Sequence, residues 1–181
     1  MFIRLASKLQ KNSIVDGEGI RAVVWTQGCP HNCPGCHNPE THDFESGFLM
    51  DIEELKKEIN ELDSETGVTL SGGDPFVQPE ACLEIAKYCH EINLNVWCYT
   101  GYTYEQLLNK SENEPIIMEF LKEIDVLVDG RFVQKLKSLE AKFRGSKNQR
   151  LINMKETLKS GKVVLIKLEE TKKNKKAKIY I

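Results

Sequence analysis

Three of the six cysteines in this 181-residue chain lie within eight positions of one another, in a spacing that suits a metal centre. Cys29, Cys33 and Cys36 form a C-x3-C-x2-C pattern, and the prolines and glycine between them allow a short loop to wrap a metal and turn its N–H groups toward sulfur. Three thiolates on a [4Fe–4S] cluster leave one iron free to bind a substrate. The remaining cysteines are scattered, and we interpret them as packing residues: Cys82, Cys89 and Cys98.

Three other interpretations compete with the iron–sulfur cluster. A structural zinc ion requires four ligands and would need His31 or His37 beside the cysteines, in a spacing unusual for a zinc knuckle. Residues 33–37 also fit the C-x-x-C-H pattern of c-type haem, which is attached outside the cytoplasm, and residues 1–11 show no export signal. A redox pair of the last two cysteines would leave the first without a role. The pattern therefore favours a three-cysteine iron–sulfur cluster.

Other conspicuous segments also follow predicted strands. Gly72-Gly73-Asp74 comes after one strand, residues 100–101 after the next, and Asp129 at the end of a third. The glycine pair allows positive φ and close approach of the backbone to a ligand, whereas Asp74 could instead cap a turn or helix. Because functional groups gather at the carboxyl ends of parallel strands, we expect these segments to surround the cysteine loop.

The elements that must position these residues alternate between strand and helix along the chain. Alternation of this kind predicts a parallel sheet. The chain is too short for a closed eight-stranded barrel, which needs about 250 residues, so an open doubly wound sheet or an incomplete barrel remains. We expect strands at 21–26, 67–71, 95–100, 124–128 and 163–168, and helices at 51–62, 79–92, 104–108, 116–122 and 154–159.

Composition predicts a single globular domain over residues 1–181, with 40% hydrophobic and 29% charged residues. No apolar run approaches the roughly 20 residues of a membrane span, and a net charge of −2 argues against nucleic-acid binding through bulk charge. We therefore expect a cytoplasmic protein that binds neither a membrane nor nucleic acid.

Residues 40–66 hold ten acids against two lysines, and residues 161–181 hold seven lysines against two glutamates. These segments are either solvated faces or docking surfaces.

The cysteine pattern resembles that of the radical S-adenosylmethionine superfamily, and further motifs narrow the resemblance to the glycyl-radical activating enzymes. The likeness covers about residues 13–152 and rests on SIVDGEGIR at 13–21, QGCPHNCPGCHNPE at 27–40, and segments at 97–102, 128–132 and 143–150. Within that family, the last three segments are similar to those of members that activate anaerobic (class III) ribonucleoside-triphosphate reductase. An activase of another glycyl-radical enzyme, such as pyruvate formate-lyase, is the alternative.

The resemblance implies an incomplete (β/α) barrel of about six parallel strands. It also implies that Cys29, Cys33 and Cys36 hold a [4Fe–4S] cluster whose open iron binds S-adenosylmethionine. One electron, from a low-potential donor such as flavodoxin or ferredoxin, would cleave that molecule to methionine and a 5′-deoxyadenosyl radical. The radical would then remove hydrogen from a glycine of the reductase. A radical enzyme acting on a small molecule and a zinc-bound interaction module remain as further hypotheses.

The resemblance also implies a set of residues that bind S-adenosylmethionine. Many superfamily members carry Glu at the position of Asp74, and many carry an aromatic residue at the position of Gly35. Asp129 could equally be a turn residue, and Arg144 and Arg150 could face the partner or solvent. The implied cofactor-binding residues are Gly72, Gly73, Asp74, Asp129, Asn38 and Arg144.

Overall fold

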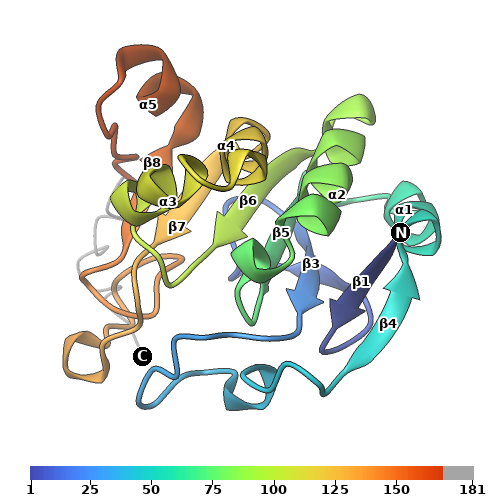
Figure 1. Cartoon of the computed structure of the whole chain (residues 1–181), viewed down its shortest axis with the longest axis horizontal. Helices are drawn as coiled ribbons and strands as arrows, with labels where there is room; N and C mark the ends of the chain where they lie inside the picture. The colour runs from blue at the N-terminus through green and yellow to red at the C-terminus, as the bar shows by residue number, and fades with distance from the viewer. Residues whose placement is uncertain (169–181) are drawn as a thin grey trace, which may run out of the picture.

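The computed structural model describes residues 1–168, and within them eight strands form one open, mixed sheet (Figure 1). The strand order is β4-β1-β3-β5-β6-β7-β8, with β2 paired to β3 beside this path. The strands are β1 (Phe2–Leu5), β2 (Gln10–Ser13), β3 (Arg21–Thr26), β4 (Phe48–Asp51), β5 (Gly67–Gly72), β6 (Asn95–Tyr99), β7 (Val126–Asp129) and β8 (Arg150–Asn153).

The predicted barrel of about six parallel strands is wrong. Among the strands of residues 1–168, only β3, β5, β6 and β7 run parallel to one another. The strands β1, β2, β4 and β8 pair antiparallel at or beside the edges, and the sheet does not close. These four strands are only four residues long, and β2 and β4 are largely exposed, so they lack the continuous apolar runs that mark buried parallel strands.

The helices form where the sequence places them. They are α1 (Ile52–Asn60), α2 (Pro79–Glu91), α3 (Tyr104–Ser111), α4 (Pro115–Lys122) and α5 (Met154–Ser160). Asp51 caps α1 by accepting a hydrogen bond from the N–H of Glu53, and Gly161 ends α5 with a φ of 68°. The strand expected at 163–168 does not form, because only an isolated bridge joins Leu165 to Ile152.

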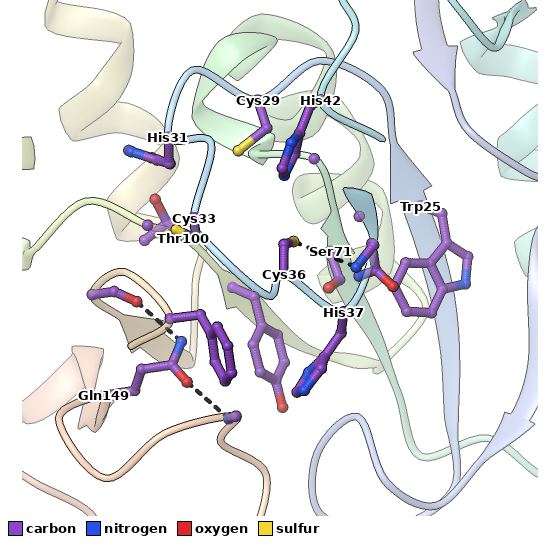
Figure 2. A pocket seen from close by; sticks show the side chains of 18 of the residues that line it. Trp25, Cys29, His31, Cys33, Cys36, His37, His42, Ser71, Thr100 and Gln149 are labelled. Carbon is purple, nitrogen blue, oxygen red and sulfur yellow. Dashed lines mark hydrogen bonds between the residues drawn. The ribbon is translucent and has the colours of Figure 1, made fainter. Parts of the chain in front are cut away.

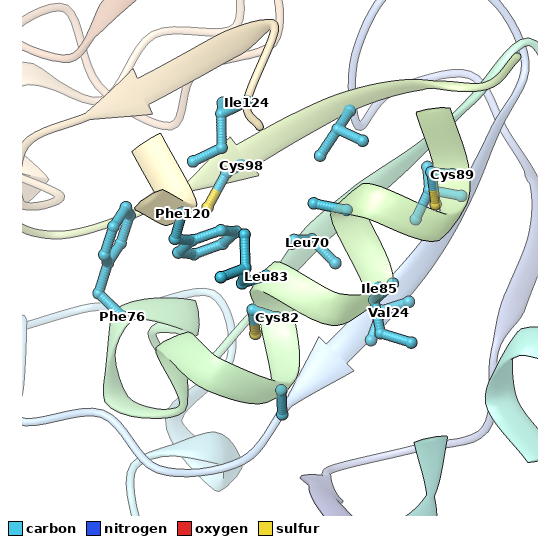
Figure 3. Close-up of a cluster of buried hydrophobic side chains, with 14 of the residues drawn as sticks. Val24, Leu70, Phe76, Cys82, Leu83, Ile85, Cys89, Cys98, Phe120 and Ile124 are labelled. Atoms are coloured by element: carbon cyan, nitrogen blue, oxygen red, sulfur yellow. The ribbon is translucent and has the colours of Figure 1, made fainter. Parts of the chain in front are cut away.

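The hydrophobic core lies between the helices and the sheet, where α2 packs against β1, β5 and β6 and against α1 and α4. The three scattered cysteines are part of this core, which confirms their packing role (Figure 3). Burial raises the pKa of the Cys89 thiol to about 12, so the thiol stays protonated at neutral pH. The fully buried cysteines are Cys82, Cys89 and Cys98.

Two further sequence features concern the outside of the molecule. None of the helices in residues 1–168 is long and apolar enough to cross a membrane. The acidic residues between 40 and 66 belong to α1, to the end of β4 and to the segments before β4 and after α1. Most of the lysine-rich segment 161–181 lies outside the described residues.

Candidate metal centre

The carboxyl ends of the four parallel strands bring the predicted segments together around one cavity of about 240 Å³ (Figure 2). The cysteine loop follows β3, and the glycine pair ends β5. Residues 100–101 follow β6, and Gly130 follows β7. The expected clustering at this sheet edge is therefore present although the predicted barrel is not. The cavity-lining residues of these segments are Cys29, His31, Cys33, Cys36, Gly72, Gly73, Thr100, Gly101 and Gly130.

The three clustered cysteines are free, partly exposed thiols, and each accepts a backbone N–H. The N–H of His31 donates to Cys29, and that of Phe132 donates to Cys33. The N–H of Asn38 lies 3.4 Å from the Cys36 sulfur. Hydrogen bonds of this kind stabilise thiolates bound to iron.

The donor set fits an iron–sulfur cluster. In the part of the chain that the structure describes, no three His, Cys, Asp or Glu side chains converge closely enough to hold a single metal ion. A cluster does not require such convergence, because each cysteine bonds a different iron. Burial raises the pKa of Cys29 to about 11 and also raises that of Cys33, so a bound metal must displace a proton from these thiols.

The carboxylate of Asp74 is fully buried and is engaged by the protein itself. It accepts hydrogen bonds from the N–H of Phe76 at 3.0 Å, from the Thr100 hydroxyl at 2.9 Å and from the N–H of Gly101 at 3.0 Å. The Nε2 atom of His31 lies 2.7 Å from the same carboxylate. Asp74 therefore caps the short helix after β5, as the alternative interpretation holds, and also connects the cysteine loop to β6.

His31 and His37 differ in their surroundings. His31 is only 7% exposed, and its ring lies edge-on to that of Tyr102 with centroids 4.5 Å apart. Its Nδ1 atom is buried without a hydrogen-bond partner among the described residues. His37 is exposed, and its ring packs 4.8 Å from that of Phe132. Of the two, only His31 joins the cysteine loop to a buried carboxylate.

The glycine pair lines the cavity with backbone. Gly72 has a φ of 101°, which favours glycine, and a Cβ atom on Gly73 would overlap the carbonyl oxygen of Gly28. The N–H of Gly73 donates to Thr26 at 2.7 Å, and the N–H of Asp74 donates to Gly28 at 2.9 Å. These contacts hold the end of β5 directly against the start of the cysteine loop.

Asp129 lies beside the cavity, but its carboxylate makes hydrogen bonds to residues that do not line the cavity. It is 1% exposed and accepts hydrogen bonds from the N–H of Tyr104 at 2.8 Å and from two guanidinium nitrogens of Arg150, with Nε at 2.9 Å. Arg150 also makes two hydrogen bonds to Glu105, at 3.0 and 2.8 Å. After the end of β7, the cavity is lined by Gly130 and not by Asp129.

The other two predicted cofactor contacts occupy different positions. Asn38 lines the cavity beside the third cysteine. Arg144 lines a neighbouring hollow of about 660 Å³ together with Asp16 and Lys137. The Nη1 atom of Arg144 donates to the carbonyl of Gln149 at 3.1 Å, and its Nε atom is buried without a partner among the described residues.

Gln149 is a cavity residue that sequence reasoning missed. Its Oε1 atom accepts hydrogen bonds from the N–H groups of Gly145 at 2.8 Å and Ser146 at 3.1 Å, and its Nε2 atom donates to Gly130 at 3.0 Å (Figure 2). One amide thus joins two loops that line the cavity. Its only signal in the sequence is its place within the 143–150 motif, because the pattern does not show that its side chain reaches Gly130, 19 residues earlier.

Known proteins match most of the chain. A family model described as a 4Fe-4S single cluster domain matches residues 15–152. The anaerobic ribonucleoside-triphosphate reductase-activating protein of Escherichia coli (strain K12) is 37% identical over 147 residues, covering 75% of this chain and 90% of that protein. The proteins of the same name in Haemophilus influenzae and Enterobacteria phage T4 are 34% and 33% identical, covering 75% and 76% of this chain and 89% and 86% of those proteins. The chain therefore belongs to the family of anaerobic ribonucleoside-triphosphate reductase-activating proteins, as its resemblance predicts.

Proposed function

We propose that this protein activates an anaerobic ribonucleoside-triphosphate reductase by forming a glycyl radical on it, with a [4Fe–4S] cluster held by Cys29, Cys33 and Cys36. The observation that carries the proposal is the arrangement of three free thiols and three backbone N–H donors around one cavity. The bound cluster, once reduced, supplies the electron that cleaves S-adenosylmethionine to methionine and a 5′-deoxyadenosyl radical.

The backbone of Gly72 and Gly73 forms the wall at which the amino-acid end of S-adenosylmethionine binds. Its carbonyl groups suit an ammonium group, because they are acceptors with no side chain in front of them. Asp74 holds this wall in place through its bonds to residues 100–101 and its contact with His31. Asn38 completes the cofactor contacts from the cysteine side of the cavity.

Asp129 and Arg144 serve the cofactor indirectly. Asp129 fixes the end of β7 through Arg150, so Gly130 rather than the carboxylate faces the cofactor. Arg144 lies in the neighbouring hollow, beside the cavity and not within its lining. Both residues therefore position loops, and neither contacts S-adenosylmethionine.

The protein partner favoured by the relatives is the reductase named in each of them. A glycine in another protein's backbone can reach the radical only through an open mouth. The neighbouring hollow shares Asp16, His37, Tyr99 and Gly145 with the cavity and so forms a continuous approach to it. Nothing in the relatives' names favours pyruvate formate-lyase as the target.

Anaerobic reconstitution tests the proposal. The protein is loaded with iron and sulfide, reduced, and mixed with S-adenosylmethionine, and the formation of 5′-deoxyadenosine is measured beside the electron paramagnetic resonance spectrum. The Cys33→Ala variant should lose the cluster and the product, whereas Cys82→Ala, which removes a buried core thiol, should retain both. A colourless protein that binds one zinc ion, or full activity in Cys33→Ala, would overturn the proposal.

A further inference from the structure

A strongly basic loop covers one side of the cysteine loop. Residues 131–147, here named the basic loop, hold six lysines and arginines and one glutamate, in a chain whose net charge is −2. Five of the six basic residues are exposed, and for four of these five no carboxylate of residues 1–168 lies within ion-pair distance. These four are Arg131, Lys135, Lys137 and Lys147.

The basic loop is built onto the candidate metal centre. The N–H of Phe132 donates to the Cys33 sulfur, and the side chain of Gln134 lies about 3.0 Å from where a Cβ atom of Gly35 would be. Lys137 pairs with Ser146 across the loop, and the Ser146 hydroxyl accepts the N–H of Val133 at 3.1 Å. Its charges are thereby held at a fixed position relative to the cysteines.

The cysteine loop is also exposed to solvent next to the basic loop. Pro34 and Gly35 are exposed, and Cys33 beside them is partly exposed. Exposed apolar side chains stand among the charges of the basic loop: Val133 at 37%, Leu136 at 42% and Leu139 at 98% exposure. Apolar groups within a charged rim are typical of protein–protein interfaces.

Charge is distributed unequally around the cysteine loop. The loop hydrogen-bonds at Gly28 and Cys29 to residues 41–42, at the start of the acidic segment 40–66. Figure 1 shows the basic loop in orange at the lower left and β4, within the acidic segment, in cyan at the lower right. An acidic partner is attracted to the first surface and repelled by the second, which orients it toward Cys33 and Gly35.

We propose that the part of the basic loop that carries Arg131, Lys135 and Lys147, outside the lining of the neighbouring hollow, is the docking surface for an acidic one-electron carrier protein that reduces the cluster. This inference rests on the proposed function. An electron donor needs only proximity to the cluster, so it docks where the protein layer is thinnest, whereas the reductase must reach the cavity itself. The step transfers one electron: the donor is oxidised by one electron, a [4Fe–4S]²⁺ cluster becomes [4Fe–4S]⁺, and no bond or proton changes place.

The test compares the double variant Lys135→Glu/Lys147→Glu, whose positions line neither the cavity nor the neighbouring hollow, with the matched variant Lys155→Glu/Lys159→Glu, which makes the same charge change at exposed positions of α5. The probe is a reduced, acidic plant-type [2Fe–2S] ferredoxin, and cluster reduction is followed by stopped-flow absorbance. At low ionic strength the first variant should react about tenfold more slowly than the native chain, and the difference should vanish at high salt. The α5 variant should react at the native rate.

Three further measurements keep the outcomes distinct. Reduction by dithionite should be equal in all variants, which shows that the clusters are intact. Calorimetric binding of oxidised ferredoxin should weaken only in the basic-loop variant, and this readout does not require S-adenosylmethionine chemistry. Equal ferredoxin rates in both variants would overturn the inference. Loss of glycyl radical formation by the basic-loop variant after dithionite reduction would also overturn the inference, because the loop would then belong to the reductase interface. A cluster that ferredoxin reduces but that never cleaves S-adenosylmethionine would refute only the proposed function.

Discussion

The buried carboxylate of Asp74 joins three segments beside the cavity: the turn after β5, residues 100–101 and the cysteine loop. Its place after two glycines suggests a cofactor ligand, yet the carboxylate accepts hydrogen bonds from Phe76 and from residues 100–101 and also contacts the His31 ring. The sequence identifies the strand end and the capping residue type. It does not reveal that Thr100 and His31 reach that carboxylate, because those contacts span 26 and 43 residues of the chain.

The first prediction is that Asp74→Ala destabilises the whole protein as well as weakening cofactor binding. The variant leaves the Thr100 hydroxyl, the Gly101 N–H and the His31 ring without their acceptor in a buried site. Loss of such a group costs about 3 kcal/mol in free energy of unfolding, measured by urea titration of the unloaded chain. Native stability combined with lost S-adenosylmethionine affinity would instead identify Asp74 as a direct ligand.

The cysteines illustrate the opposite case, because their chemistry is readable from type and spacing alone. A thiol has few roles, and three within eight positions point to a shared ligand.

The second prediction is that alkylation distinguishes the clustered thiols from the buried ones. In the unloaded native chain, Cys29, Cys33 and Cys36 should react with iodoacetamide, and the three buried cysteines should react only after unfolding. Mass spectrometry of the peptides measures this, and early modification of Cys98 would contradict the packed core.

At the scale of elements, the central strands and the five α-helices of residues 1–168 could be predicted from the sequence, and the edge strands could not. The strand β3 carries the apolar, β-branched sequence RAVVWT and is buried along nearly its whole length. By contrast, β2 has the sequence QKNS, whose residues are mostly exposed and polar, so no periodicity marks it. Such strands form because a neighbouring strand offers hydrogen-bonding groups, which a local pattern does not show.

The third prediction concerns the ion pairs of Arg150 in β8 with Glu105 in α3 and Asp129 in β7. Hydrogen bonds from Arg150 lower the pKa of Glu105 to about 2, from an ordinary value of 4.5. A lowered folded-state pKa contributes stability that is present above pH 4.5 and is lost as pH falls toward 2. In Glu105→Gln the free energy of unfolding should therefore be lower at pH 7 and should fall less between pH 5 and pH 2. Glu112→Gln, an exposed change after the same helix, is the control and should follow the native curve.

The fourth prediction concerns His90, which joins α2 to the turn between α4 and β7. Burial lowers its pKa, but hydrogen bonds to Asp125 and Glu123 outweigh burial and raise the pKa above 6.5. A raised folded-state pKa contributes stability that is complete below pH 6.5 and is lost as pH rises through the folded pKa. His90→Gln should remove this pH dependence from the free energy of unfolding. An unchanged slope above pH 6.5 would show that the two hydrogen bonds do not favour the charged ring.

At the scale of the whole molecule, the site forms where the parallel strands end together, and it does not depend on which strands flank them. The barrel prediction fails because antiparallel strands flank the parallel centre on both sides. The location of the cavity nevertheless follows from β3, β5, β6 and β7 alone, since each contributes the residues just past its carboxyl end. Sequence reasoning therefore locates the site more reliably than it predicts the edges of the sheet.

The fifth prediction is that cluster loading protects two loops and leaves the core unchanged. Residues 28–42 carry the three cysteines, and residues 130–149 line the same cavity through Gly130, Phe132, Gly145 and Gln149. A cluster bonded to three cysteines binds only the folded chain, so it stabilises the structure by mass action. Hydrogen exchange should slow in both loops on loading, while exchange in α2 changes only with global stability.

The Cys33→Ser variant provides the comparison for this fifth measurement. It keeps a small polar side chain in the loop but removes one of the three iron ligands, so anaerobic loading should produce no protection in either segment. The Cys82→Ala variant should behave as the native chain does, because its thiol lies in the core and away from the cavity. Protection confined to residues 28–42 would show that the second loop does not form a wall of the loaded site. The cluster would then be held by the cysteine loop alone, and the basic loop would lose the fixed position on which electron-donor docking depends.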